Sequence, residues 1–388
     1  MLGHRIRLFS LFGFDVRVDA SWLLLASLIA WSLAEGVFPE LAPGLGAATY
    51  WWMATAVTIG LLMSIVFHET AHSLVARRFG IAIRGITLFV FGGVAELEGE
   101  PKRARSELFM AIAGPIASLC IALALFLLLA VGRRFAVPDA VAGALWYLSY
   151  LNLVLAIFNL VPAFPLDSGR VLRAALWAWR GDIVWATRIA ATAGDVFGLL
   201  LMGLGIVEFL RGDFVGGVWQ FLIGTFLRGA AAGEYQQTVT QQVFAEVQVA
   251  QVMNEQPISM SPDVTVAECV EGFIYRYHHD EFPVVQNGRL LGTIGTRQAA
   301  KLGPSRWQNT SVGDAMVPCS DTATIDAGSP VLKALAKLSS GGRKHLYVLS
   351  NGRFTGVVAL RDLRDILSIR LELLGERGAA RTLMRTGR

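Results

Sequence analysis

Residues 50–72 form the segment YWWMATAVTIGLLMSIVFHETAH, which has no charged residue before Glu69. About 20 apolar residues are enough for a helix to cross a bilayer, so the segment predicts a membrane span. His68 and His72 are four residues apart, so on a helix they share one face and can bind the same metal ion, with Glu69 placed to act on a bound water. Ionisable side chains at such depth are costly and usually functional. The segment therefore predicts hydrolysis inside a lipid bilayer.

The composition places the chain among integral membrane proteins. Of its 388 residues, 54% are hydrophobic and only 16% are charged, whereas soluble proteins carry about 25% charged residues. The apolar character is concentrated before residue 232. The net charge of +4 comes without a dense Lys/Arg run, which argues against a nucleic-acid-binding surface. The three cysteines are far apart and form no CxxC, which argues against a disulfide framework and a thiolate zinc site.

Hydrophobicity predicts a polytopic α-helical membrane protein with about six spans, over residues 20–36, 50–76, 107–132, 141–163, 187–210 and 214–231. Arg and Lys gather in the 77–106 and 164–186 connections. Positive charge favours the cytoplasmic side, so both termini are expected in the cytoplasm. Arg133 and Arg134 oppose this orientation, because they would fall outside. The protein itself is expected in the inner (plasma) membrane. A cleaved secretory signal is the alternative for the first span, but no convincing cleavage site follows it.

Residues 86–97 separate the second and third spans and have the pattern strand, turn, strand. The segment is too short to cross a bilayer. Backbone at membrane depth must be buried in protein or face water, so we expect a membrane-associated β-hairpin.

A repeat follows the membrane region. Val252–Asn254 recurs as Ala315–Val317, and Gln286–Arg289 recurs as Ser350–Arg353, at offsets of 63 and 64 residues. Asn-Gly between two apolar runs is a strong hairpin signal, so each copy predicts a small α/β unit. The expected domains are a transmembrane domain (1–232), a polar, helical linker (233–248), two α/β domains (249–306 and 307–371) and a tail (372–388).

A second motif closes the fourth span, NLVPAFPLDSGR from Asn159 to Arg170. Pro162 and Pro165 must break the helix. Asp167 follows the break at the same cytoplasmic depth as the end of the second span, so the topology brings it beside His68 and His72. Catalytic zinc usually has three protein ligands plus water, and the two histidines leave such a site one ligand short.

With both motifs present, residues 1–232 resemble the site-2 protease family of intramembrane zinc metalloproteases. The resemblance rests on His68-Glu69-x-x-His72 and on Asn159-x-x-Pro162-x-x-Pro165-Leu166-Asp167-x-Gly169. Ala113-Gly114-Pro115 with Ser118 is similar to a third family element, and the hairpin with Gly92 and Gly93 lies where the family has its β segment. Ser168 stands where the family commonly has a second glycine.

This resemblance implies that His68, His72 and Asp167 are the ligands of one zinc ion per chain. Glu69 would be the general base, taking a proton from a zinc-bound water that attacks the peptide carbonyl and passing it to the leaving amine. The substrate would be a transmembrane segment of another protein.

Other polar residues of the spans have two interpretations each. Asn159 would hold the substrate, as would Gly92 and Gly93 by strand addition, although Asn159 can instead bridge helices and Gly114 can simply allow close packing. Asn152, Asp195 and Glu208 are expected to be structural.

The repeats resemble a tandem cystathionine-β-synthase (CBS) domain pair, which implies binding of ATP or AMP through a motif Gly-h-h-Ser/Thr-x-x-Asp. In the first copy Gly295 and Gln298 replace the hydroxyl and the acid, with Thr296 next to them, whereas the second copy retains the acid as Asp362. The candidate nucleotide residues are therefore Asp362 and Thr296. The alternative is a purely structural or dimerising module that makes a homodimer.

Two alternatives to a protease remain at the level of sequence. A CBS-regulated transporter or channel would repeat ion-coordinating residues in the two halves of the membrane region, and no such repeat is found in the sequence. A catalytically inactive scaffold would be unaffected by Glu69→Gln. About one zinc ion per chain would distinguish the protease from the transporter.

Overall fold

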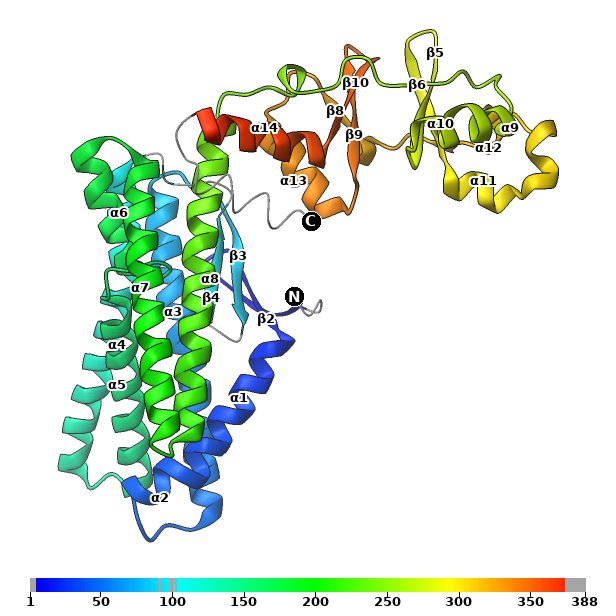
Figure 1. The fold of residues 1–388 in the computed structure, drawn as a ribbon. Coiled ribbons are helices and arrows are strands. Elements are labelled where there is room, and N and C mark those ends of the chain that lie inside the picture. Colours follow the sequence, from blue (N-terminus) through cyan, green and yellow to red (C-terminus); the bar gives the residue numbers. More distant parts are fainter. Residues whose placement is uncertain (1–4, 90–91, 98–100, 102, 374–388) are drawn as a thin grey trace. The chain divides into compact units, whose positions relative to one another are not determined.

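The computed structural model describes residues 5–89, 92–97, 101 and 103–373. The chain divides into two compact units, Met1–Tyr235 and Gln236–Arg388. Figure 1 shows the long helices of the first unit and the mixed α/β structure of the second. Each unit is described by itself below.

Five helical segments among the described residues are long and apolar enough to cross a membrane. They are Ala20–Leu41 (α1 Ala20–Ser32, a π-helical turn Leu33–Val37 and α2 Phe38–Leu41), α3 Ala47–Arg78, Ala104–Phe135 (α4 Ala104–Gly132 and a 3-10 turn), α5 Asp139–Asn159 and α7 Ile183–Leu210. The expected sixth span falls in the first part of α8, Phe214–Phe244, which is not one of these five. A count of six therefore stays a prediction.

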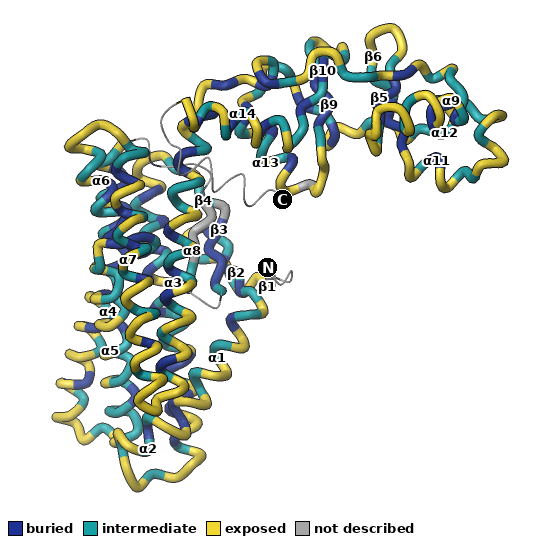
Figure 2. The backbone as a smooth tube through the Cα atoms, in the orientation of Figure 1, coloured by how far each residue is buried: buried dark blue, intermediate teal, exposed yellow. Residues whose placement is uncertain are grey.

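The outer faces of these helices carry large apolar side chains. Leu123, Phe126 and Leu127 of α4 and Leu199 and Leu200 of α7 are exposed, and exposed residues recur along the helices of the bundle (Figure 2). In water such faces would be costly, whereas a helix that faces lipid satisfies its backbone internally and needs an apolar surface.

A four-stranded sheet lies within the first unit. Its strands are β1 Arg5–Leu11, β2 Phe14–Asp19, β3 Ile83–Phe89 and β4 Gly92–Leu97, in the order β1-β2-β3-β4. The β3–β4 pair is antiparallel and is the hairpin predicted from residues 86–97. The two N-terminal strands were not predicted, because the basic residues there indicated only membrane orientation. Val16 and Ile86 bury the sheet against Trp22 of α1 and Val66 of α3.

The connection after the fourth span contains a helix that was not predicted, α6 Asp167–Arg180. Helix α5 ends at Asn159, and residues 160–166 form turns, as the two prolines predict. Leu166 is the N-cap of α6, and Gly181 ends it in the left-handed conformation at φ 76°. Asp167 therefore lies at the first position of a helix rather than in an irregular loop.

The second unit contains the two predicted repeats. The first has helical turns at 266–277, β5 Glu281–Gln286, β6 Arg289–Gly295 and α11 Thr296–Leu302. The second copy begins with α12 Val312–Ala315 and β7 Val317–Pro318, and β7 pairs with β6 of the first. The second copy continues with β8 Thr324–Asp326, α13 Val331–Gly341, β9 His345–Ser350, β10 Arg353–Ala359 and α14 Leu360–Leu373.

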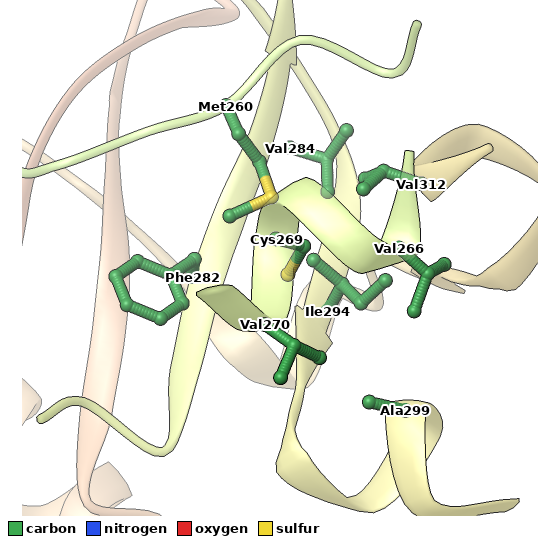
Figure 3. Packing of buried hydrophobic residues seen from close by; sticks show 9 residues of the cluster. All are labelled: Met260, Val266, Cys269, Val270, Phe282, Val284, Ile294, Ala299 and Val312. Atoms are coloured by element: carbon green, nitrogen blue, oxygen red, sulfur yellow. The ribbon is translucent and has the colours of Figure 1, made fainter. Parts of the chain in front are cut away.

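Both Asn-Gly turns form as predicted. Asn287 and Asn351 have φ of 52° and 50°, and the following glycines have φ of 76° and 75°. Positive φ at both central residues is typical of the type I′ hairpin turn. Behind the first hairpin, a cluster of apolar side chains including Phe282, Ile294 and Cys269 is buried (Figure 3). Residues 233–244 of the expected linker continue α8.

Candidate metal centre

Three side chains from two distant segments meet in the C-terminal part of α3. His68 Nε2 lies 3.0 Å from Asp167 Oδ2, and His72 Nε2 lies 3.2 Å from Asp167 Oδ1. The two Nε2 atoms are 3.2 Å apart. One ligand atom from each residue lies within 4.8 Å of the others. Burial by itself favours the neutral acid, but the facing imidazoles hold the pKa of Asp167 below its usual range.

The donor set fits a zinc ion. Two imidazole nitrogens and one carboxylate oxygen are usual ligands of catalytic zinc, and tetrahedral bonds of the usual length imply donor separations of about 3.3 Å. The separation of 3.2 Å between His68 Nε2 and His72 Nε2 is close to this value. The two imidazoles lie 3.0 Å and 3.2 Å from the two different oxygens of the Asp167 carboxylate. Three protein donors occupy three positions of a tetrahedral ion, and the fourth is the position that water or substrate takes in catalytic zinc sites.

Helix α4 leaves the space that this cluster needs. A Cβ atom at Gly114 would lie 2.2 Å from His72 Nε2 and 2.5 Å from His68 Nε2. These distances are far below a van der Waals contact, so no side chain can occupy this position without displacing the imidazoles. The neighbours of Gly114 at this position are the imidazole rings themselves.

The same helix also orients both rings. His68 Nδ1 lies 2.9 Å from Ser118 Oγ, and His72 Nδ1 donates to the carbonyl oxygen of Met110 at 2.7 Å. A carbonyl oxygen can only accept, so Met110 favours the His72 tautomer that leaves Nε2 available to a metal, and the Ser118 hydroxyl holds the orientation of the His68 ring. Ser118 belongs to the third sequence element. The part played by the Met110 carbonyl could not be foreseen, because a backbone acceptor has no signature in the sequence.

The segment that carries Asp167 is held closely by its neighbours. The Phe164 N–H donates to Ala190 O of α7 at 3.2 Å. A Cβ at Gly169 would lie 2.5 Å from the backbone of Ala163 and Phe164, so glycine is required there. Ser168 occupies the second position of α6, where an ordinary helical backbone needs no glycine. The departure from the family pattern at Ser168 therefore has no steric consequence.

Glu69 lies beside strand β4. A Cβ at Gly93 would be 2.6 Å from Glu69 Cγ and 3.1 Å from Glu69 Oε1, so the strand passes directly against the carboxylate. Gly92 pairs with Phe89 where the two strands meet. Strand β4 is the last in the sheet order among the described residues.

The remaining predicted residues lie apart from the cluster. Asn159 Nδ2 donates to Leu155 O of its own helix at 3.0 Å, and the described contacts join it to none of the three donors. Asn152 Nδ2 donates to Ser64 Oγ at 3.0 Å, and Arg228 Nε pairs with Asp195 at 2.6 Å. These contacts connect neighbouring helices, which agrees with the structural part expected of Asn152 and Asp195.

The two candidate nucleotide residues differ in position. Asp362 lines a cavity of about 1620 Å³ between the repeats, together with Arg343, Lys344 and Tyr347, whereas Thr296 is not among the lining residues. In the first repeat Gln298 Oε1 accepts from the N–H of Gly295 at 3.1 Å, so the residue at the acid position caps its own helix.

Comparisons with known proteins find relatives of both the membrane part and the repeats. The sequence matches peptidase family M50 over residues 56–144 and 134–204, and the CBS domain over 249–302 and 312–369. The Rip3 protein of Mycobacterium tuberculosis is 36% identical over 359 residues, which are 92% of this chain and 91% of that protein. A zinc metalloprotease of Methanocaldococcus jannaschii is 29% identical over 376 residues, or 97% and 99% of the two chains.

One solved structure, a site-2 protease from Methanocaldococcus jannaschii, is 30% identical with a TM-score of 0.42. The match covers 60% of this chain and 95% of that chain.

Proposed function

Because the chain belongs to peptidase family M50, the site-2 proteases, and is therefore an intramembrane zinc metalloprotease with a CBS domain pair, we propose that His68, His72 and Asp167 hold its zinc ion and that Glu69 is its general base. The observation that carries this proposal is the meeting of three zinc-type donors beside a carboxylate at the end of a membrane helix. Because the chain belongs to this protease family, the alternative of a transporter or channel is rejected.

In the proposed mechanism, a bound zinc ion would lower the pKa of a coordinated water to about 7 and polarise the scissile carbonyl. Glu69 accepts one proton from the attacking water as the oxygen bonds to the carbonyl carbon. The carbon–nitrogen bond then breaks, and Glu69 returns the proton to the leaving amine. The products are a carboxylic acid and an amine, so one water is consumed and Glu69 ends as it began.

The proposed substrate is a transmembrane segment of another protein, unwound near the cleaved bond. An intact helix has its carbonyls bonded internally, so an extended conformation is needed for attack. Strand β4 supports this proposal, because it lies against Glu69 and has one edge without a partner strand in the described sheet. A substrate strand added at that edge would bring its carbonyl groups toward the catalytic carboxylate. Asn159 is proposed to hold the same segment.

The test of the proposed function is metal content together with cleavage. The full-length protein, purified in detergent, is expected to contain about one zinc per chain and to lose it to a strong chelator. In liposomes it is expected to cleave a co-reconstituted transmembrane peptide, and chelation should stop cleavage until zinc is restored. The Asp167→Ala variant lacks one of the three proposed ligands and should retain far less zinc. A protein without zinc, or an Asp167→Ala variant with full zinc, would contradict the proposal.

We further propose that the CBS pair binds an adenine nucleotide in the cavity that Asp362 lines. The cavity combines a carboxylate suited to ribose hydroxyls with Arg343 and Lys344, which suit phosphate. Calorimetry with AMP and ATP is the measurement. Asp362→Asn should weaken binding by about tenfold or more, the usual worth of a hydrogen bond to a charged group. Thr296→Ala, outside the cavity, should bind as the wild type does.

If neither nucleotide binds the wild-type protein, the alternative of a structural or dimerising module is favoured, and the oligomeric state in detergent tests it. The inner membrane and cytoplasmic termini are proposed from the Arg and Lys distribution.

A further inference from the structure

We propose that the buried ion pair between Arg173 and Glu107 is a positioning device that fixes Asp167 relative to the two histidines. This inference rests on the proposed zinc site and extends it to two residues outside the cluster. Arg173 lies on α6, six residues after Asp167, and Glu107 lies in the first turn of α4.

The pair is fully enclosed by protein. The side chains of Arg173 and Glu107 are 3% and 1% exposed, and Arg173 Nε donates to Glu107 Oε1 at 2.6 Å. Glu107 Oε2 has no hydrogen-bond partner among the described atoms. Desolvation of two charges offsets much of their attraction, so a buried pair is a weak source of stability. A role in specifying geometry is the better account of a pair placed here.

Arg173 contacts the segment that leads into Asp167. Its guanidinium lies over the ring of Phe164, 5.1 Å from the ring centroid. Phe164 is itself buried and lies three residues before Asp167. Arg173 thus connects α4 both to the helix that begins at Asp167 and to the turn just before it.

The opposite end of this connection is the face of α4 that serves the histidines. Glu107, Met110, Gly114 and Ser118 follow one another at spacings of three and four residues, so they share one face of the helix. Met110 and Ser118 orient the rings of His72 and His68, and Gly114 gives both rings room. With Glu107 holding Arg173, a single helix face sets the position of all three proposed ligands.

The test measures zinc affinity in the purified full-length protein by competition with a chromophoric chelator. Arg173→Met keeps most of the side-chain length but removes the charge, and Glu107→Gln keeps the shape of the partner. Each is expected to weaken zinc binding by about 10- to 100-fold, the usual loss when an outer partner of a ligand is removed. Arg228→Met breaks the half-exposed pair with Asp195 and is the control, with zinc affinity as in the wild type.

A double variant, Glu107→Leu with Arg173→Met, separates positioning from stability. It leaves no unpaired buried charge, so its thermal stability should exceed that of Arg173→Met alone. Its zinc affinity should stay low, because the connection to Asp167 is still missing. The proposal is overturned if the double variant, or a folded single variant, binds zinc as tightly as the wild type. Failure of the wild type itself to bind zinc would instead contradict the proposed function.

Discussion

Glu69→Gln is expected to lower the rate of peptide cleavage by about a thousandfold or more while the protein keeps its zinc. General acid–base catalysis contributes about 10²–10⁴-fold, and here one carboxylate is proposed both to accept and to return the proton. The carboxamide has nearly the same size, so its contact with Gly93 should remain. Glu69 is not one of the three donors, which is why metal binding should persist. Cleavage of a co-reconstituted transmembrane peptide and zinc content are measured on the same preparation.

Glu208→Gln is the matched control, because Glu208 is another carboxylate within a membrane helix and is expected to be structural. It should cleave at the wild-type rate. Cleavage by Glu69→Gln at a rate close to that of the wild type would remove Glu69 from the mechanism. Loss of zinc in this variant would mean that Glu69 is a ligand rather than a base. A wild-type protein that holds zinc but cleaves no transmembrane peptide would favour the inactive scaffold.

The sequence alone predicted that His68, His72 and Asp167 lie close together. The i, i+4 spacing predicted that His68 and His72 share a helix face, and the side of the membrane predicted that Asp167 lies beside them. The structure places the atoms 3.0–3.2 Å apart. Spacing and membrane side are properties of short segments, which is why they could be inferred without the fold. The identity of these residues as zinc ligands stays a proposal until metal is measured.

What the sequence could not show depends on contacts between distant segments. Strand β2 pairs in parallel with β3, with Val16 opposite Ile86. A local sequence pattern cannot predict a partner strand so far along the chain. The hydrogen bond of the Met110 carbonyl and the ion pair of Glu107 with Arg173 join α4 to α3 and α6, so they depend on how these helices pack. Helix α6 lies in a charged connection just after two prolines, which predict the end of a helix and say nothing of the helix that begins at Asp167.

Gly114→Ala is expected to abolish zinc binding although it adds only one methyl group. That methyl carbon would lie 2.2 Å and 2.5 Å from the two Nε2 atoms, whereas attractive contacts between heavy atoms need about 3.5–4.0 Å. The histidines cannot easily withdraw, because Met110 and Ser118 of the same helix face hold their Nδ1 atoms. We therefore expect zinc affinity to fall by at least about 100-fold, more than the usual loss for an outer partner, and cleavage to be lost with it.

Gly203→Ala separates this steric effect from the general effect of replacing a helical glycine. Gly203 lies inside α7, and nothing is within 4 Å of the position where its Cβ would be. Alanine favours a helix over glycine by about 1 kcal/mol, so Gly203→Ala should keep or gain thermal stability. In Gly114→Ala the clash with the imidazoles costs about 1–3 kcal/mol, so zinc affinity is compared on folded protein. Only Gly114→Ala should then fail to bind zinc, as Asp167→Ala does. Wild-type zinc affinity in Gly114→Ala would show that a side chain at this position does not obstruct the imidazoles, and it would contradict the proposed metal centre.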